Sequence, residues 1–133
     1  YMQDASQVKQ VFEGVYQLLK EAGTFIFDVH STYQIDTIFP EYSYHDQTED
    51  FAFLWDSYPG DSDHSIEHFL TFFVKQEEEI FERFDELHKE RTYPLDMYQK
   101  MLTEVGFKVE VFADFMDEHP NEKSKRWFFV CNK

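Results

Sequence analysis

Two stretches of this chain follow the same plan, in which an amphipathic helix ends at a glycine and leads directly into an apolar strand. The first helix covers residues 11–23 and continues into 24–30, and the second covers 98–106 and continues into 107–112. A glycine at the end of a helix suits the left-handed backbone conformation that closes the helix and turns the chain. Two such units predict a layered α/β sheet, with the long segment between them as an insertion.

The segment between the two units alternates polar and apolar residues with the period of two that β-strands show. It predicts an antiparallel meander of three strands, separated by turns at 59–63 and 76–79. We expect one domain, with a helix and strand at 1–40, the meander at 41–93, and a helix with the last two strands at 94–133. In the first predicted strand, one face carries Phe51, Phe53 and Trp55. In the second, one face carries Ile66, His68, Leu70, Phe72 and Val74. In the third, one face carries Ile80, Phe84, His88 and Thr92, interrupted by Glu82, Glu86 and Glu90.

The outer parts of the chain complete the predicted sheet. Residues 24–30 are almost continuously apolar, which is typical of a strand covered on both faces. The following residues, 31–39, are expected to form a loop with a helical turn. The last two strands are expected at 107–115 and 126–131, where apolar residues dominate again.

Composition excludes several classes of protein. A chain of 133 residues with 42% hydrophobic and 20% aromatic residues forms a packed core rather than a disordered segment. No apolar run is long enough to span a membrane, and no signal peptide is visible. The single cysteine, Cys131, allows no disulfide within the chain and fits a reducing cytoplasm.

The net charge of −15 is concentrated in the insertion. Residues 41–90 carry fifteen acidic and three basic side chains, whereas residues 91–133 carry seven of each. An acidic chain is a poor partner for nucleic-acid phosphates, so we expect no nucleic-acid binding. Two interpretations of the acidity remain open: a solvated surface that keeps the protein soluble, or an acidic lid that attracts a cationic substrate.

Four segments in a fixed order connect these patterns to a known family. They are residues 18–31, 85–94, 101–107 and 126–131. In this order they resemble the C-terminal half of a class I S-adenosylmethionine-dependent methyltransferase, of the bacterial small-molecule type with an antiparallel β insert. The resemblance covers nearly the whole chain. It implies three strands and two helices of a larger Rossmann-like sheet, a methyl donor as cofactor, and a small-molecule substrate.

The chain departs from the family in one respect. The family holds its donor with a glycine-rich loop and an acidic residue that come earlier in the fold, and the four glycines of this chain are too far apart to form that loop. By resemblance the chain is therefore one domain from a larger methyltransferase. We expect no cofactor-binding residue and no bound S-adenosylmethionine in the chain alone. Because its strand 24–30 would lack a neighbour, we also expect a homo-oligomer. The alternative function is a non-catalytic binding or oligomerisation domain with an acidic β-meander.

Candidate site residues cluster at strand ends and in the third meander strand. In α/β sheets ligands bind at the carboxyl ends of parallel strands, which is where Asp28 and His30 lie. Glu86 and His88 alternate on one face of the third strand, and a carboxylate beside an imidazole can orient a general base. We take His88 and His30 as catalytic candidates. The substrate-binding candidates are Trp55, His68, Glu86, Arg91 and Tyr93.

Each candidate also has a purely structural interpretation. His30 can simply bond a backbone group at the end of its strand, and the charged residues of the third strand can form a cross-strand ladder of ion pairs. Trp55, Tyr58 and Tyr93 can be core rather than an aromatic wall for a substrate. His68, His88 and Glu86 together imitate a metal-binding set, but their spacing matches no zinc signature, and we assign no metal.

Overall fold

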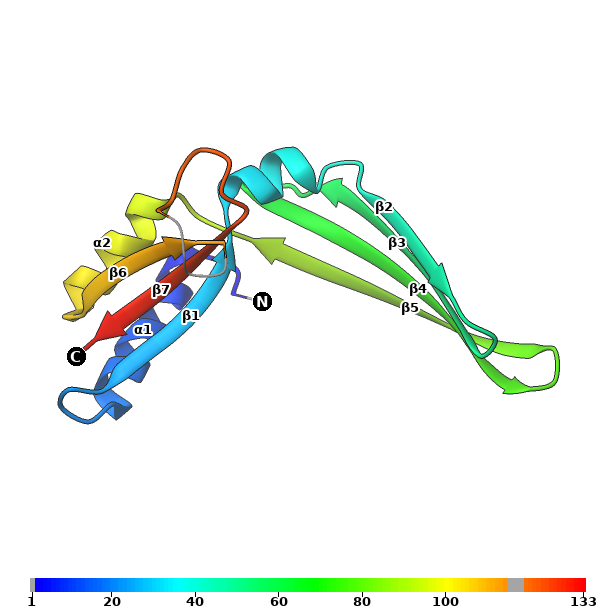
Figure 1. Ribbon diagram of the computed structural model, residues 1–133, viewed down its shortest axis with the longest axis horizontal. Helices are drawn as coiled ribbons and strands as arrows, with labels where there is room; N and C mark the ends of the chain where they lie inside the picture. Colours follow the sequence, from blue (N-terminus) through cyan, green and yellow to red (C-terminus); the bar gives the residue numbers. More distant parts are fainter. Residues whose placement is uncertain (1, 115–118) are drawn as a thin grey trace.

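The computed structural model describes residues 2–114 and 119–133, which form a layered α/β part and a long β-meander that extends from it (Figure 1). The elements follow one another as α1 (Ala5–Leu18), β1 (Thr24–His30), a π-helical turn η1 (Gln34–Ile38), β2 (Ser43–Gln47), β3 (Phe51–Pro59), β4 (Ser65–Glu77), β5 (Ile80–Arg91), α2 (Leu95–Val105), β6 (Lys108–Ala113) and β7 (Arg126–Asn132). The α/β fold with an antiparallel insertion is confirmed. The end of the predicted strand at Phe115 lies outside the described residues.

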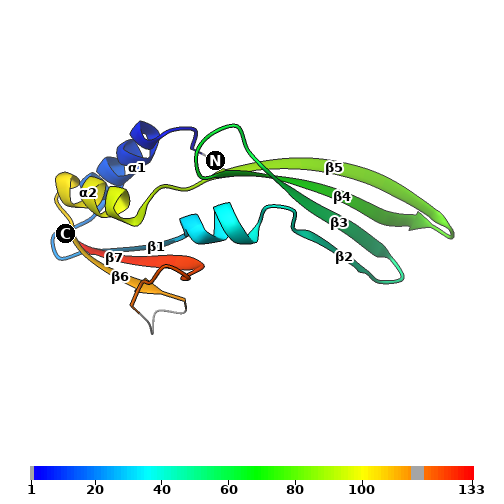
Figure 2. The same cartoon turned by 90° about the horizontal axis from the view of Figure 1, so that it is seen from above.

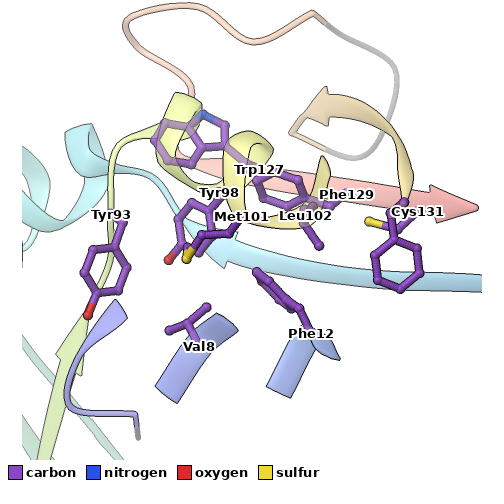
Figure 3. Packing of buried hydrophobic residues seen from close by; sticks show 10 residues of the cluster. Val8, Phe12, Tyr93, Tyr98, Met101, Leu102, Trp127, Phe129 and Cys131 are labelled. Atoms are coloured by element: carbon purple, nitrogen blue, oxygen red, sulfur yellow. The ribbon is translucent and has the colours of Figure 1, made fainter. Parts of the chain in front are cut away.

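The layered part is a three-stranded sheet of order β1-β7-β6 with both helices on one face (Figure 2). Each neighbouring pair of strands is antiparallel. Side chains alternate along β7, so Trp127, Phe129 and Cys131 point to the helix side and are buried. They pack against Phe12 of α1 and Leu102 of α2 in a single core, as Figure 3 shows.

The other face of this sheet is uncovered among the described residues. Burial alternates along β1, and Ile26 is 57% exposed on the face away from the helices. The prediction that residues 24–30 are covered on both faces is therefore wrong for the described chain. Strand β1 is also an edge strand, since β7 is its single neighbour in the described sheet. An apolar edge strand with unpaired backbone groups is a template for another strand.

The meander is a four-stranded antiparallel sheet of order β2-β3-β4-β5, where the sequence predicted three strands. The additional strand β2 is short and exposed along its whole length, and it carries no apolar alternation that would reveal it. The predicted faces of the other strands agree with the register, in which Ser57 lies opposite His68 and His68 lies opposite His88. On the same face the rings of Phe53 and Phe72 stack, and the ring of Phe51 packs against both at a tilt.

The two helix–glycine–strand units end their helices differently. Gly106 has the left-handed backbone that the sequence predicted, with φ of 123°, and its N–H bonds the carbonyls of Leu102 and Thr103. In the first unit the helix already ends at Leu18, and Ala22 with φ of 62° makes the left-handed turn instead of Gly23. The prediction that Gly23 closes the first helix is therefore wrong, because a separate turn lies between α1 and β1.

This difference allows a matched test with two glycines. A Cβ at Gly106 would lie 3.0 Å from the Tyr16 ring and force a strained backbone, whereas a Cβ at Gly14 in α1 meets nothing within 4 Å. We expect Gly106→Ala to lower the free energy of unfolding by about 1–2 kcal/mol, and Gly14→Ala to raise it by about 0.5–1 kcal/mol. Urea denaturation of the two variants measures both changes. Equal effects would contradict the assigned helix ends.

Candidate functional site

The carboxyl end of β1 is held in place from both sides. The hydroxyl of Thr92, just after β5, donates a hydrogen bond of 2.7 Å to the carbonyl of His30. Ser31 is fully buried, and its hydroxyl accepts a bond from the backbone N–H of Gln34, which starts the helical turn η1. The turn then places the ring of Phe39 against His30. The last residue of β1 is thereby fixed where the two sheets meet.

Glu90 joins the two sheets by accepting hydrogen bonds from two histidines. Its Oε1 pairs with Nδ1 of His30 on β1, and its Oε2 lies 3.2 Å from Nε2 of His68 on β4. The ring of Phe39 packs edge-on against both imidazoles, at centroid distances of 5.1 Å and 4.9 Å. Both carboxylate oxygens of Glu90 are therefore used, in a setting that is largely closed to water.

The inner end of this network is a buried hydroxyl. The Nδ1 of His68 lies 2.6 Å from the Oγ of Ser57 and 3.1 Å from the indole Nε1 of Trp55. The same indole N–H also reaches the Ser57 hydroxyl at 2.9 Å. Ser57 is 1% exposed. Serine, histidine and glutamate thus follow one another as in a hydrolytic triad, but a serine with no surface cannot attack a substrate, so this end of the network is structural.

The outer end of the network is open to solvent. A guanidinium nitrogen of Arg126, the first residue of β7, lies 2.9 Å from Nε2 of His30. Another nitrogen of Arg126 lies 2.7 Å from Oδ2 of Asp28. The side chains of Arg126 and Asp28 are 45% and 38% exposed, and that of His30 is 23% exposed. We call the whole set the junction cluster: Trp55, Ser57, His68, Glu90, His30, Arg126 and Asp28.

The environment of Glu90 favours the carboxylate form. Burial alone would raise the pKa of Glu90, but the hydrogen bonds from His30 and His68 and the attraction of the two rings lower this pKa from its ordinary value of 4.5 to about 2. Glu90 is therefore ionised at neutral pH. A carboxylate that is held against an imidazole in this way can orient the ring and stabilise a proton on it.

A cavity of about 450 Å³ begins at the outer end of the junction cluster and runs along β1 beside α1. Asp28, His30 and Arg126 line it together with Arg91 and Tyr93. The guanidinium of Arg91 lies 5.1 Å from the Tyr93 ring centre and donates to the carbonyl of Gln3. Burial raises the pKa of the Tyr93 hydroxyl, and this hydroxyl has no hydrogen-bond partner among the described residues.

The structure brings some of the predicted site residues together and leaves others apart. His30, His68 and Trp55 meet in the junction cluster, and Arg91 and Tyr93 lie together at the cavity. His88 and Glu86 lie farther along β5, where they pair at 2.8 Å with side chains that are 39% and 54% exposed.

The three aromatic residues that were considered as a wall or as core lie in separate places. Trp55 packs with Phe39, whereas Tyr93 packs with the core of the layered part. Tyr58 contacts Phe69 on the other face of the meander.

Sequence reasoning left out the residue on which the cluster depends. Glu90 shares a face with Glu86 and His88 on β5 and lies diagonally from His68, and this alternation was the available signal. Ser57 and Arg126 were also left out, and each lies directly opposite a cluster histidine in the strand register. The residues that the structure describes contain no group of three acidic, histidine or cysteine side chains that could hold a metal ion. In the same part of the chain, no helix has the length and apolar character needed to cross a membrane.

Two curated bacterial proteins match the whole of this chain in sequence. The chain is 48% identical to "Putative methyltransferase GWCH70_2453" of Geobacillus sp. (strain WCH70) and 39% identical to "Putative methyltransferase YqeM" of Bacillus subtilis (strain 168), each over 134 residues. The chain spans about half the length of these relatives, 54% in both cases. No family model matches the chain.

Solved structures confirm the fold. An S-adenosylmethionine-dependent methyltransferase from Clostridium acetobutylicum superposes with a TM-score of 0.84 and is 24% identical in sequence. The match covers 97% of this chain and 52% of the Clostridium chain. DesVI of Streptomyces venezuelae has a TM-score of 0.76 and 15% identity, and the match covers 98% of this chain and 52% of the DesVI chain. CalS10, an amino pentose methyltransferase solved with S-adenosylmethionine bound, matches at 0.73 with 10% identity over the same shares. The predicted resemblance to part of an S-adenosylmethionine-dependent methyltransferase is confirmed, since the curated relatives are named putative methyltransferases and the Clostridium structure is an S-adenosylmethionine-dependent methyltransferase with the same fold.

The lowered pKa of Glu90 gives a testable dependence of stability on pH. Above about pH 4.5 the stabilisation from the ionised carboxylate is fully present. As the pH falls from 4.5 towards 2, the unfolded chain takes up a proton that the folded chain does not, and a contribution of up to about 3 kcal/mol is lost. We expect the free energy of unfolding to fall more steeply in the wild type than in Glu90→Gln over this range. The exposed Glu86→Gln should keep the wild-type slope, and equal slopes for all three proteins would contradict the geometry.

Proposed function

We propose that this chain forms the acceptor-binding half of an S-adenosylmethionine-dependent methyltransferase that acts on a small molecule. The observation that carries the proposal is the arrangement of β1, the meander, α2, β6 and β7, which known methyltransferases share over nearly the whole chain. The junction cluster supports it, because a titratable dyad lies at the carboxyl end of β1. In open α/β sheets that end is where ligands bind.

The described residues do not form a site for the methyl donor. A donor loop needs glycines between the end of a strand and the start of a helix. The two strand-to-helix connections of this chain, at 31–33 and 92–94, contain no glycine. We propose that other parts of the longer protein hold S-adenosylmethionine, which supplies an electrophilic methyl group. The role of this chain is to bind and orient the acceptor.

His30 is the first candidate for a group that contacts the acceptor. Its Nε2 faces the open end of the junction cluster, and its Nδ1 is held by Glu90. An acceptor that carries a proton on a nitrogen or oxygen fits such a base. Arg91 and Tyr93 line the adjoining cavity and are proposed to bind the body of the acceptor. Trp55 and His68 lie behind Glu90 and would act through it.

His88 with Glu86 remains the second catalytic candidate. The pair belongs to β5, which we propose faces the substrate of the longer protein, and it has the same elements as the His30–Glu90 dyad. It is more exposed than that dyad, so it depends on a covering segment to exclude water.

A non-catalytic role in oligomerisation is the alternative function. The meander extends away from the layered part (Figure 1). Large apolar side chains on it are exposed, among them Leu54, Phe69 and Phe84. Together with the free edge of β1 in the described sheet, this supports our proposal of a homo-oligomer. A monomer in light scattering at high micromolar concentration would contradict the oligomer.

A chimera tests the methyltransferase proposal. The matching 134 residues of the Geobacillus relative are replaced by this chain, and binding of S-adenosylmethionine is measured by isothermal titration calorimetry. We expect micromolar binding to the chimera, as to the intact relative, and no measurable binding to the chain alone, because its glycines do not form a donor loop. A folded chimera that does not bind the donor would contradict the proposal. Micromolar binding to the chain alone would contradict our placement of the donor site.

A further inference from the structure

The hydrogen bonds of the junction cluster fix the protonation of both histidine rings. Arginine and indole nitrogens donate and never accept. Because Arg126 lies at 2.9 Å from Nε2 of His30, that nitrogen carries a lone pair, and the proton is on Nδ1, facing Glu90. Because Trp55 donates to Nδ1 of His68, the proton of that ring is on Nε2, which also faces Glu90.

Glu90 is thus the common acceptor of an Nδ1–H from His30 and an Nε2–H from His68. Its two oxygens take one N–H each, and the ring of Phe39 closes the cluster from the side of η1. The neighbouring Glu86 pairs with a different ring, that of His88. Glu90 and Arg126 together therefore set which nitrogen of His30 presents a lone pair to the surface.

We propose that Glu90, supported by His68, is a positioning residue that holds His30 with the lone pair of Nε2 at the rim of the site, where it can accept a proton. Arg126 covers this nitrogen until the molecule that receives the methyl group takes the place of the guanidinium. This proposal rests on the proposed function for the identity of the acceptor, and on the geometry alone for the tautomers.

The geometry shows how the exchange can occur. Arg126 is 45% exposed and keeps a second bond, of 2.7 Å, to Asp28, so its guanidinium can leave His30 without losing its ion pair. An amine or hydroxyl of the acceptor then donates its hydrogen bond to Nε2. When the proton is transferred, the N–H or O–H bond of the acceptor breaks and an Nε2–H bond forms. The resulting imidazolium keeps its Nδ1–H on the Glu90 carboxylate, which balances the new charge.

The tautomers can be measured in this chain without any cofactor. Long-range ¹H–¹⁵N correlation spectra distinguish a protonated ring nitrogen from one with a lone pair, and variants that lack one histidine at a time assign the six rings. We expect His30 to be protonated on Nδ1 and His68 on Nε2. Protonation of His30 on Nε2, or fast exchange between its two tautomers, would overturn the proposal.

The variant Glu90→Gln tests whether Glu90 sets the tautomers. A glutamine amide offers one acceptor and one donor, so one of the two rings must present a lone pair to it. His30 cannot turn over, because Nε2–H would then face the donor Arg126. His68 can, because the Ser57 hydroxyl can accept from Nδ1–H while the indole N–H of Trp55 keeps its other bond, to the same hydroxyl. We therefore expect His68 to change tautomer in Glu90→Gln while His30 does not.

The matched control is Glu86→Gln, which lies on the same face of β5 but outside the cluster. It should leave the tautomers of His30 and His68 unchanged. If Glu90→Gln also leaves both unchanged, Glu90 does not position the rings and the inference fails. This failure is separate from that of the proposed function, because the chimera can bind its methyl donor whichever tautomer His30 adopts.

Discussion

One buried carboxylate holds the two sheets of this protein together. The transfer of an isolated carboxylate out of water costs far more than a single hydrogen bond returns, so a buried charge persists when each of its oxygens has a good donor. Glu90 meets this condition with His30 on one side and His68 on the other. The meander and the layered part are also joined by the links at 31–42 and 92–94 and by the bond from Arg91 to the carbonyl of Gln3. The contact between Glu90 and His30 therefore helps to set the position of the meander.

The same contact connects the fold to the proposed chemistry. The cluster runs from the buried Ser57 to the exposed Arg126, and the catalytic candidate His30 lies at the boundary between the two environments. Its buried nitrogen is fixed and its other nitrogen can exchange partners. Such a residue can be both a part of the structure and a proton acceptor. Within the cluster, Glu90 has its hydrogen-bond partners in the rings of His30 and His68.

Local patterns in the sequence were sufficient for most of the elements. The apolar run at 24–30 and the glycine at 106 predicted a strand and a helix end because both depend on neighbouring residues alone. The strand at Ser43–Gln47 was not predicted, because all its side chains are exposed and its residues show no apolar alternation. Its pairing with β3, rather than its own composition, makes it a strand. Gly23 was misassigned because Ala22 adopts the left-handed conformation that glycine usually supplies.

The candidate site was predicted in part for a related reason. Alternation placed Glu86, His88 and Glu90 on one face, and it identified His30 at the end of a strand. Which carboxylate meets His30 is decided by the path of the chain between residues sixty positions apart, and a single sequence does not contain that path. Arg126 lies ninety-six positions from His30 in the sequence, and the pairing of β1 with β7 brings the two together. Local sequence patterns do not predict this pairing either.

A double-mutant cycle tests the central claim that the contact between His30 and Glu90 stabilises the junction of the two sheets. The free energies of unfolding of the wild type, His30→Ala, Glu90→Ala and the double variant are measured by urea denaturation at neutral pH. The account predicts a coupling energy of about 1–3 kcal/mol, because each single change leaves a buried polar group without its partner. Additive effects, within about 0.5 kcal/mol, would contradict it.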